Sequence, residues 1–226
     1  MRGMIMRSRL LFYTALLCAA MLPARAQSDG QATFFVGRLK YSQNDGNDCQ
    51  GVGESLIQLV SKASNIEVRD EVTIRITDEK LYQTPFLFMN GHGHFQLSEE
   101  EVTRLGDYLK RGGFIMASGC CTNPAFPDAW RHQFGRLLPG VEVEVIPETH
   151  PLFKAFYKVG VIRSLHERRD IFVEGLIWEG AVVAVLVEEG LCCAFSMDNN
   201  CNSGKGVNPT DGKKLALNIA VYALTH

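Results

Sequence analysis

Two short apolar runs with an amphipathic stretch between them dominate the hydrophobic pattern in the middle of the chain. Phe86–Met89 and Phe114–Ala117 are apolar throughout, as buried strands are. Between them, apolar positions recur at steps of three and four, the period of a helix with one buried face: Val102, Leu105, Tyr108 and Leu109. Ser98 and Glu101 have the spacing of a capping box, and Gly112-Gly113 ends the periodic stretch. We therefore predict a strand, a helix and a second strand.

A unit of this kind places its two strands in parallel with a right-handed crossover, so both strands end at the same edge of the sheet. The first run ends in Asn90-Gly91-His92-Gly93-His94, and the second ends in Ser118-Gly119-Cys120-Cys121. Ligands of open α/β sheets bind at this carboxyl edge. The pattern predicts that the two histidines and the cysteine pair face one crevice.

The same reasoning extends along the chain and predicts an α/β fold with a mainly parallel sheet. Further strands are expected at Phe34–Leu39, Glu67–Ile76, Val141–Val145 (an edge strand) and Leu191–Met197 (buried on both faces), with a hairpin of residues 175–178 and 182–187 around Glu179-Gly180. Further helices are expected from about Gly51, over Pro124–Leu138, briefly after His150-Pro151, and from Asn208-Pro209 to the end.

The first 26 residues have the composition of a secretory signal peptide. Arginines precede an apolar stretch from Leu10 to Leu22, and Ala24-Arg25-Ala26 is a small-x-small cleavage site. We therefore predict export to the periplasm or the extracellular space after cleavage near Ala26, and one domain over residues 27–226. The mature chain contains no segment that would span a membrane.

Charge narrows the range of partners. Cleavage removes four of the 23 basic residues and none of the 25 acidic ones, so the mature chain carries a net charge of about −6. No basic run is present, which argues against a nucleic-acid partner. The identity of a small-molecule or protein partner is left open by the composition, as is that of any cofactor.

Four sequence segments resemble a family of bacterial exported proteins known as domain of unknown function 4159. They are Tyr-Ser-Gln-Asn-Asp-Gly at 41–46, Pro-Phe-Leu-Phe-Met-Asn-Gly-His at 85–92, Gly-Gly-Phe at 112–114 and His-Pro-Leu-Phe at 150–153. The resemblance covers nearly all of the mature chain. It implies a flavodoxin-like, three-layer domain of the class I glutamine amidotransferase type, and it implies no particular activity.

Active amidotransferases of that fold carry a Gly-x-Cys-x-Gly elbow after a strand that corresponds to Phe114–Ala117. Here the segment reads Ser118-Gly119-Cys120-Cys121-Thr122-Asn123, so the glycine pattern is incomplete for either cysteine. The His-x-Glu pair near the end of such chains has no match either. These departures argue against full glutaminase activity.

Two kinds of chemistry fit the residues at the predicted edge. Cys120 or Cys121 is a candidate nucleophile, with His92 or His94 as its base, because a following helix and a histidine favour a thiolate. Alternatively, His92, His94 and Cys121 are candidate ligands of a metal such as zinc. Polar residues at strand ends and turns form a wider set of candidate binding residues: Asn44, Asp45, Asp48, Asn90, Asn123, His150, Asp198, Asn199 and Asn200.

Structural interpretations compete with these functional ones. Asn and Asp at strand ends often cap helices or form turns, and His150 before a proline suits a turn. Cys192 and Cys193 lie within an apolar run and are expected to be core thiols. Cys49 and Cys201 lie in loops of a chain expected to be exported, where a disulfide between them is a further possibility.

Three function classes remain: a small-ligand-binding or interaction module, a cysteine-dependent hydrolase or amidase, and a metal-binding protein. The incomplete elbow favours the binding module over the enzyme. The concentration of reactive residue types at one edge keeps the hydrolase and the metal protein as alternatives.

Overall fold

The computed structural model describes residues 33–41, 51–165, 167, 169–195 and 205–226. The predicted signal peptide lies outside the described residues, and so do the loop at 42–50 and the segment 196–204. Cys49 and Cys201, for which the sequence left a disulfide open, therefore also fall outside them.

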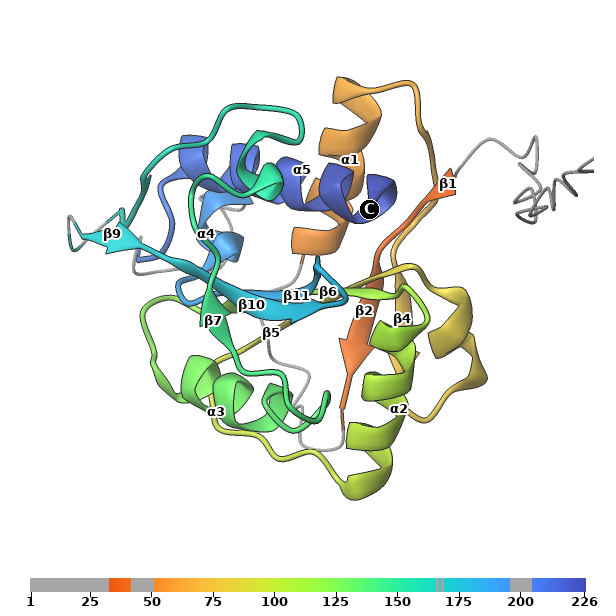
Figure 1. Ribbon diagram of the computed structural model, residues 1–226. Helices are drawn as coiled ribbons and strands as arrows, with labels where there is room; N and C mark the ends of the chain where they lie inside the picture. The colour runs from red at the N-terminus through yellow and green to blue at the C-terminus, as the bar shows by residue number, and fades with distance from the viewer. Residues whose placement is uncertain (1–32, 42–50, 166, 168, 196–204) are drawn as a thin grey trace, which may run out of the picture. The chain divides into compact units, whose positions relative to one another are not determined.

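A seven-stranded sheet forms the middle layer of the described part of the chain (Figure 1). In spatial order its strands are β4 (Val72–Arg75), β2 (Gly37–Lys40), β5 (Phe86–Gly91), β6 (Phe114–Gly119), β11 (Ala181–Val187), β10 (Val173–Trp178) and β7 (Glu144–Val145). The first five run parallel to one another. Strand β10 is antiparallel to both β11 and β7. The predicted α/β class and the mainly parallel sheet are confirmed.

The predicted strand–helix–strand unit is confirmed in detail. Strands β5 and β6 pair in parallel from Phe86 opposite Phe114 to Gly91 opposite Gly119. Helix α2 (Glu99–Lys110) connects them. The Ser98 Oγ accepts a hydrogen bond from the Glu101 N–H at 3.2 Å, and the Glu101 carboxylate accepts one from the Ser98 N–H at 2.9 Å. This reciprocal capping box fixes where the helix begins.

Helices cover both faces of the sheet (Figure 1). Helices α1 (Val52–Ala63), α4 (Leu191–Phe195) and α5 (Pro209–Thr225) pack on one face, and α2 and α3 (Ala125–Phe134) pack on the other. Successive side chains of β5 alternate between the two hydrophobic clusters, with Phe88 in one and Met89 in the other. No helix among the described residues is long and apolar enough to cross a membrane.

Shorter elements complete the described chain: β1 (Thr33–Phe34), β3 (Glu67–Val68), β8 (Ile162–Arg163), β9 (Asp170–Ile171) and the 3-10 turns η1 (Glu79–Gln83) and η2 (Pro151–Lys154). The strand predicted over Glu67–Ile76 is divided into β3 and β4, and β3 pairs with β1 outside the main sheet. The run Phe34–Leu39 is likewise divided between β1 and β2. The predicted edge strand is confirmed, but β7 contains only the last two residues of the predicted range.

The predicted hairpin is confirmed. Strands β10 and β11 are joined by Glu179 and Gly180, which have φ values of 50° and 84°. Two successive residues with positive φ form the tight turn that matches the twist of a hairpin.

The prediction of a buried strand over Leu191–Met197 is wrong. Residues 191–195 form helix α4, and β11 occupies the position beside β6 that the prediction gave to this run. Leu191 and its three successors are buried, as predicted, but against α5 and α1 rather than inside the sheet. A short apolar run has no period that distinguishes a buried helix from a buried strand, which explains the error.

Candidate functional site

The cysteine elbow follows β6 at the carboxyl edge of the sheet. Cys120 is completely buried and belongs to the hydrophobic cluster that includes Phe88 and Val187. Cys121, the next residue, is only half-buried. Both are thiols. Of the two candidate nucleophiles, Cys121 is therefore the one that solvent can reach.

Cys121 has a left-handed backbone, with a φ of 56°. Among the described residues that are not glycine, the only other positive φ belongs to Glu179, where the hairpin turn requires it. A conformation of this kind costs on the order of 1–3 kcal/mol for a side chain with a Cβ, and it persists only where its surroundings impose it. The elbow is thus a strained turn between a strand and a helix.

Contacts with the loop after β11 impose this conformation. The Gly190 N–H donates a hydrogen bond to the Cys121 carbonyl at 3.0 Å. The Ser118 hydroxyl accepts one from the Leu191 N–H at 2.9 Å and donates to the Glu189 carbonyl at 3.1 Å. Gly119 approaches so closely that a Cβ there would lie 2.2 Å from the Glu188 carbonyl oxygen. The elbow and this loop therefore form one rigid unit.

Helix α3 begins directly after the elbow. The Asn123 side chain accepts a hydrogen bond from the Ala125 N–H at 3.0 Å, which satisfies one of the first N–H groups of the helix. Asn123 occupies the position where the amidotransferase pattern has its second glycine, and it lies one residue before Pro124, the N-cap of α3. The Thr122 N–H, immediately after Cys121, donates no hydrogen bond within the described part of the chain.

The histidine loop is an exposed tip between two buried anchors. His92 and His94 are exposed, whereas Gly91 and Phe95 on either side are buried. The Phe95 ring lies between the rings of Tyr41 and Phe126, at centroid distances of 4.9 and 5.3 Å. These aromatic contacts hold the tip at the carboxyl edge, beside the start of α3.

A backbone hydrogen bond joins the histidine loop to the elbow. The Cys120 N–H donates to the Gly91 carbonyl at 3.0 Å, one step beyond the paired residues Gly91 and Gly119. The structure therefore places His92 and the cysteine pair at adjacent strand ends. The described residues contain no group of three or more His, Cys, Asp or Glu side chains arranged to hold a metal ion. The metal site at His92, His94 and Cys121 stays a prediction.

A network of ion pairs that the sequence pattern did not predict lies beside the elbow. Arg131 of α3 donates two hydrogen bonds to the Glu174 carboxylate, at 2.7 and 2.8 Å. These bonds raise the pKa of the Arg131 guanidinium. Glu188 lies 3.5 Å from Arg131 and 2.6 Å from Arg169. The network links α3 and β10 to the loop that holds Cys121. Its only sequence signal is Glu188-Glu189 directly after the apolar run of β11.

Glu189 is the most buried carboxylate of this network, with 1% of its surface exposed. Its Oε1 lies 2.7 Å from the Arg169 Nη2. Burial raises the pKa of Glu189, and the Ser164 hydroxyl and the Arg169 guanidinium offset this only in part. The glutamate next to Gly190 therefore carries a charge that is costly to bury.

The other predicted binding residues are dispersed. Asn90 is buried within β5. His150 caps η2, where its Nδ1 accepts a hydrogen bond from the Leu152 N–H at 3.2 Å, and its ring lies 5.4 Å from that of Tyr222. The Tyr222 hydroxyl accepts a hydrogen bond from Val182, near the start of β11. Since β11 and β6 are parallel, His150 lies at the edge of the sheet opposite the elbow. The remaining candidates are outside the described residues: Asn44, Asp45, Asp48, Asp198, Asn199 and Asn200.

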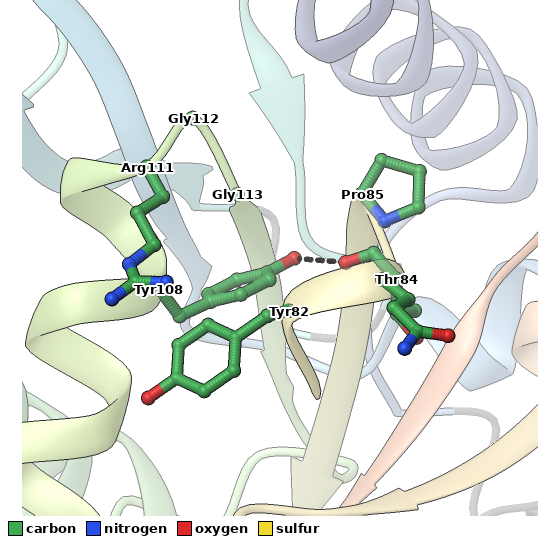
Figure 2. Close-up of a pocket in the computed structure, with 8 residues that line it drawn as sticks. Tyr82, Thr84, Pro85, Tyr108, Arg111, Gly112 and Gly113 are labelled. Atoms are coloured by element: carbon green, nitrogen blue, oxygen red, sulfur yellow. Dashed lines mark hydrogen bonds between the residues drawn. The ribbon is translucent and has the colours of Figure 1, made fainter. Parts of the chain in front are cut away.

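A cavity of about 300 Å³ opens at that opposite edge, where the chain enters β5 and β6. Figure 2 shows the Tyr108 ring in its wall, with the hydroxyl directed at the Thr84 carbonyl 2.8 Å away. The same hydroxyl accepts a hydrogen bond from the Phe114 N–H at 3.2 Å. A Cβ on Gly113 would lie 2.2 Å from the Tyr108 ring. The Gly-Gly-Phe segment at 112–114 thus has a structural explanation, because the tyrosine needs that space.

Comparisons with known proteins identify the family of this chain. No curated protein matches the chain. The model of one family, described as a domain of unknown function (DUF4159), matches residues 36–224, which include all the described strands except β1 and all the described helices except the last residue of α5. The chain therefore belongs to the DUF4159 family.

Proposed function

We propose that this protein is a cysteine-dependent acyl-transfer enzyme, a hydrolase or amidase, with Cys121 as its nucleophile. The observation that carries the proposal is the left-handed backbone of Cys121 in a tight turn from a parallel strand to a helix. Enzymes that use such a turn expose the nucleophile above the carboxyl edge of the sheet. The strain at Cys121 has no explanation in a hairpin or a glycine turn, so we attribute it to the presentation of the thiol.

The surrounding groups suit the steps of such a reaction. The Cys121 thiolate attacks the carbonyl carbon of an ester or amide after a histidine, His92 or His94, takes the thiol proton. The histidine returns this proton to the leaving alcohol or amine as the bond to it breaks. Water then attacks the resulting thioester and releases the acid and the thiol. The Thr122 N–H occupies the position that donates to the oxyanion in enzymes with this elbow.

The departure from the amidotransferase pattern counts less against an enzyme because Asn123 has a structural role here, in which its side chain binds the first N–H group of α3. The left-handed turn forms here without a glycine at that position. For this reason we prefer the enzyme to the binding module that the sequence pattern favoured. The missing His-x-Glu pair distinguishes the proposed site from that of glutaminases, and the histidine loop after β5 takes its place in the proposal.

The strand order supports the fold that the family resemblance implies. Numbered along the chain, the five parallel strands lie in the order 2-1-3-4-5, which is the order of flavodoxin-like sheets. In such sheets the ligand crevice opens where the order reverses, between the carboxyl ends of β2 and β5. The histidine loop follows β5 directly. We propose that the substrate lies over this crevice, with its carbonyl directed towards Cys121.

The proposed place of action is outside the cytoplasm, on the basis of the signal-peptide composition of residues 1–26. Fractionation of cells that express the full chain tests this. Recovery of the mature protein, cleaved near Ala26, outside the cytoplasm is the expected result, and an uncleaved cytoplasmic chain contradicts it.

An activated ester tests the nucleophile without knowledge of the natural substrate. The protein is mixed with p-nitrophenyl acetate, quenched in acid, and mapped by mass spectrometry of its peptides. We expect rapid acetylation of Cys121 and release of p-nitrophenol, and Cys121→Ala should abolish both. Cys120→Ala is the matched control, because it removes the neighbouring buried thiol and should leave the reaction unchanged. Acetylation of Cys121 no faster than in the unfolded chain would refute the proposal and favour the binding module.

A further inference from the structure

Two cysteine pairs that are distant in the sequence meet at Gly190. A Cβ placed on this glycine would lie 2.8 Å from the Cys121 nitrogen and 3.2 Å from the Sγ atoms of both Cys192 and Cys193. The two latter sulfurs are 4.0 Å apart. All these cysteines are thiols. The backbone of the half-buried nucleophile candidate and two buried thiols thus lie against the same glycine.

The backbone around Gly190 keeps the pairs together. Its N–H donates to the Cys121 carbonyl at 3.0 Å, and its own carbonyl accepts a hydrogen bond from the Val207 N–H at 3.3 Å. Helix α4 begins at the next residue and carries Cys192 and Cys193 on its first turn. The Cys193 thiol donates to the Lys205 carbonyl. These hydrogen bonds hold the backbone of Cys121 and the thiols of Cys192 and Cys193 around the same glycine.

We propose that Cys121 and the Cys192–Cys193 pair form a dithiol site that reacts with small disulfides. The Cys121 thiolate attacks one sulfur of the disulfide, forms a mixed disulfide, and releases the first small thiolate. Cys192 or Cys193 then loses its proton, attacks the Cys121 sulfur, and displaces the second small thiolate. Two protein thiols are oxidised to one disulfide, and the small disulfide is reduced to two thiols, which take up the two protons.

Exposure assigns the roles. Cys121 is half-buried and meets the incoming disulfide, whereas Cys192 and Cys193 are 2% and 1% exposed and can react only with a sulfur already bound inside the protein. A disulfide between Cys192 and Cys193 themselves is disfavoured, because they are neighbours in a helix and cannot approach without a change of backbone. Oxidation would also consume the nucleophile proposed for acyl transfer.

This inference rests on the reactivity of Cys121 in the proposed function but does not require acyl transfer. Oxidised glutathione is the probe. The protein is incubated with it, remaining thiols are blocked with iodoacetamide, and peptides are mapped without reduction. We expect the wild-type chain to lose glutathione from Cys121 and to contain a peptide pair linked from Cys121 to Cys192 or Cys193. The double variant Cys192→Ser/Cys193→Ser should instead keep glutathione on Cys121.

The wild-type map decides the question even where the double variant fails to fold. Stable glutathione on wild-type Cys121, a linked pair that excludes Cys121, or no reaction at Cys121 would each overturn the inference. Cys120→Ala is the control and should give the wild-type map. Acetylation by p-nitrophenyl acetate without the linked peptide pair would refute the dithiol site alone, and the linked pair without acetylation would refute acyl transfer alone.

Discussion

The Cys120 N–H donates a hydrogen bond to the Gly91 carbonyl at 3.0 Å, and this bond aligns the histidine loop with the cysteine elbow. It continues the parallel pairing of β5 and β6 beyond the last strand residues. His92 and Cys121 each follow a partner of this bond by one residue. The sheet therefore positions the start of the histidine loop next to the cysteine elbow.

The histidine loop should control the reactivity of Cys121. We expect His92→Ala or His94→Ala, whichever removes the base, to slow acetylation of Cys121 by a factor of about 10²–10⁴, the usual contribution of a general base. His132→Ala is the control, since His132 is exposed on α3 and should not affect the rate. Equal rates for all three variants and the wild type would exclude histidine as the base.

Gly119 should tolerate no side chain. Gly119→Ala places a Cβ 2.2 Å from the Glu188 carbonyl oxygen, so the elbow must separate from the loop after β11. We expect a loss of about 1–3 kcal/mol in the free energy of unfolding, measured by urea denaturation. Gly93→Ala is the matched control, because its Cβ would have no atom within 4 Å. Equal stabilities of the two variants would contradict the close contact at Gly119.

The Tyr108 hydroxyl should stabilise the entry to both central strands. Tyr108→Phe removes its hydrogen bonds to Thr84 and Phe114, both of which are backbone groups in a buried setting. We expect a loss of about 1–3 kcal/mol in the free energy of unfolding, because the buried Thr84 carbonyl loses this donor, whereas the Phe114 N–H still donates to the Pro85 carbonyl at 3.0 Å. Tyr82→Phe, in the same cavity but partly exposed, should cost much less. A Tyr108→Phe variant as stable as wild type would contradict this assignment.

Glu189 should give stability a characteristic pH dependence. Burial raises its folded-state pKa above the ordinary value of 4.5, so the folded chain binds its proton more tightly than the unfolded chain does. The stabilising contribution of this group is complete below pH 4.5 and is lost as the pH rises through the folded-state pKa. Glu189→Gln removes the titration. We expect the unfolding free energy of wild type, relative to this variant, to decrease as the pH is raised from 4.5. A relative stability that rises with pH would contradict the burial.

Local sequence signals predicted the centre of the fold. Ser98, Glu101 and Gly112-Gly113 are signals that depend on a few neighbouring residues, and the capping box and the turn formed as expected. The parallel pairing of β5 and β6 then followed from the helix between them. By contrast, the strand predicted over Leu191–Met197 depended on which run lies beside β6. Pairing with β6 is a long-range contact, and β11 makes it. The apolar residues of both runs are equally suited to such a buried strand.

The candidate site was predictable to the same extent. The parallel strands predicted the edge of the sheet at which the site lies. The difference between Cys120 and Cys121 is one of backbone conformation, which residue type does not reveal. The meeting of Cys121 with Cys192 and Cys193 depends on Gly190, whose partner residues are remote in the sequence. His150 caps η2 and the Asn123 side chain binds the first N–H group of α3, and residues of these types serve equally in turns, in caps and in binding sites.

The most direct test of the nucleophile is the rate at which iodoacetamide alkylates each cysteine of the wild-type chain in mildly acidic buffer, followed by peptide mass spectrometry. The same chain unfolded in guanidinium chloride provides the reference rate. The proposed site predicts that Cys121 reacts first and faster in the folded chain than in the unfolded one, because the proposed histidine base takes the thiol proton as the sulfur attacks. Folded Cys121 that reacts no faster than unfolded Cys121 would contradict its role as a nucleophile.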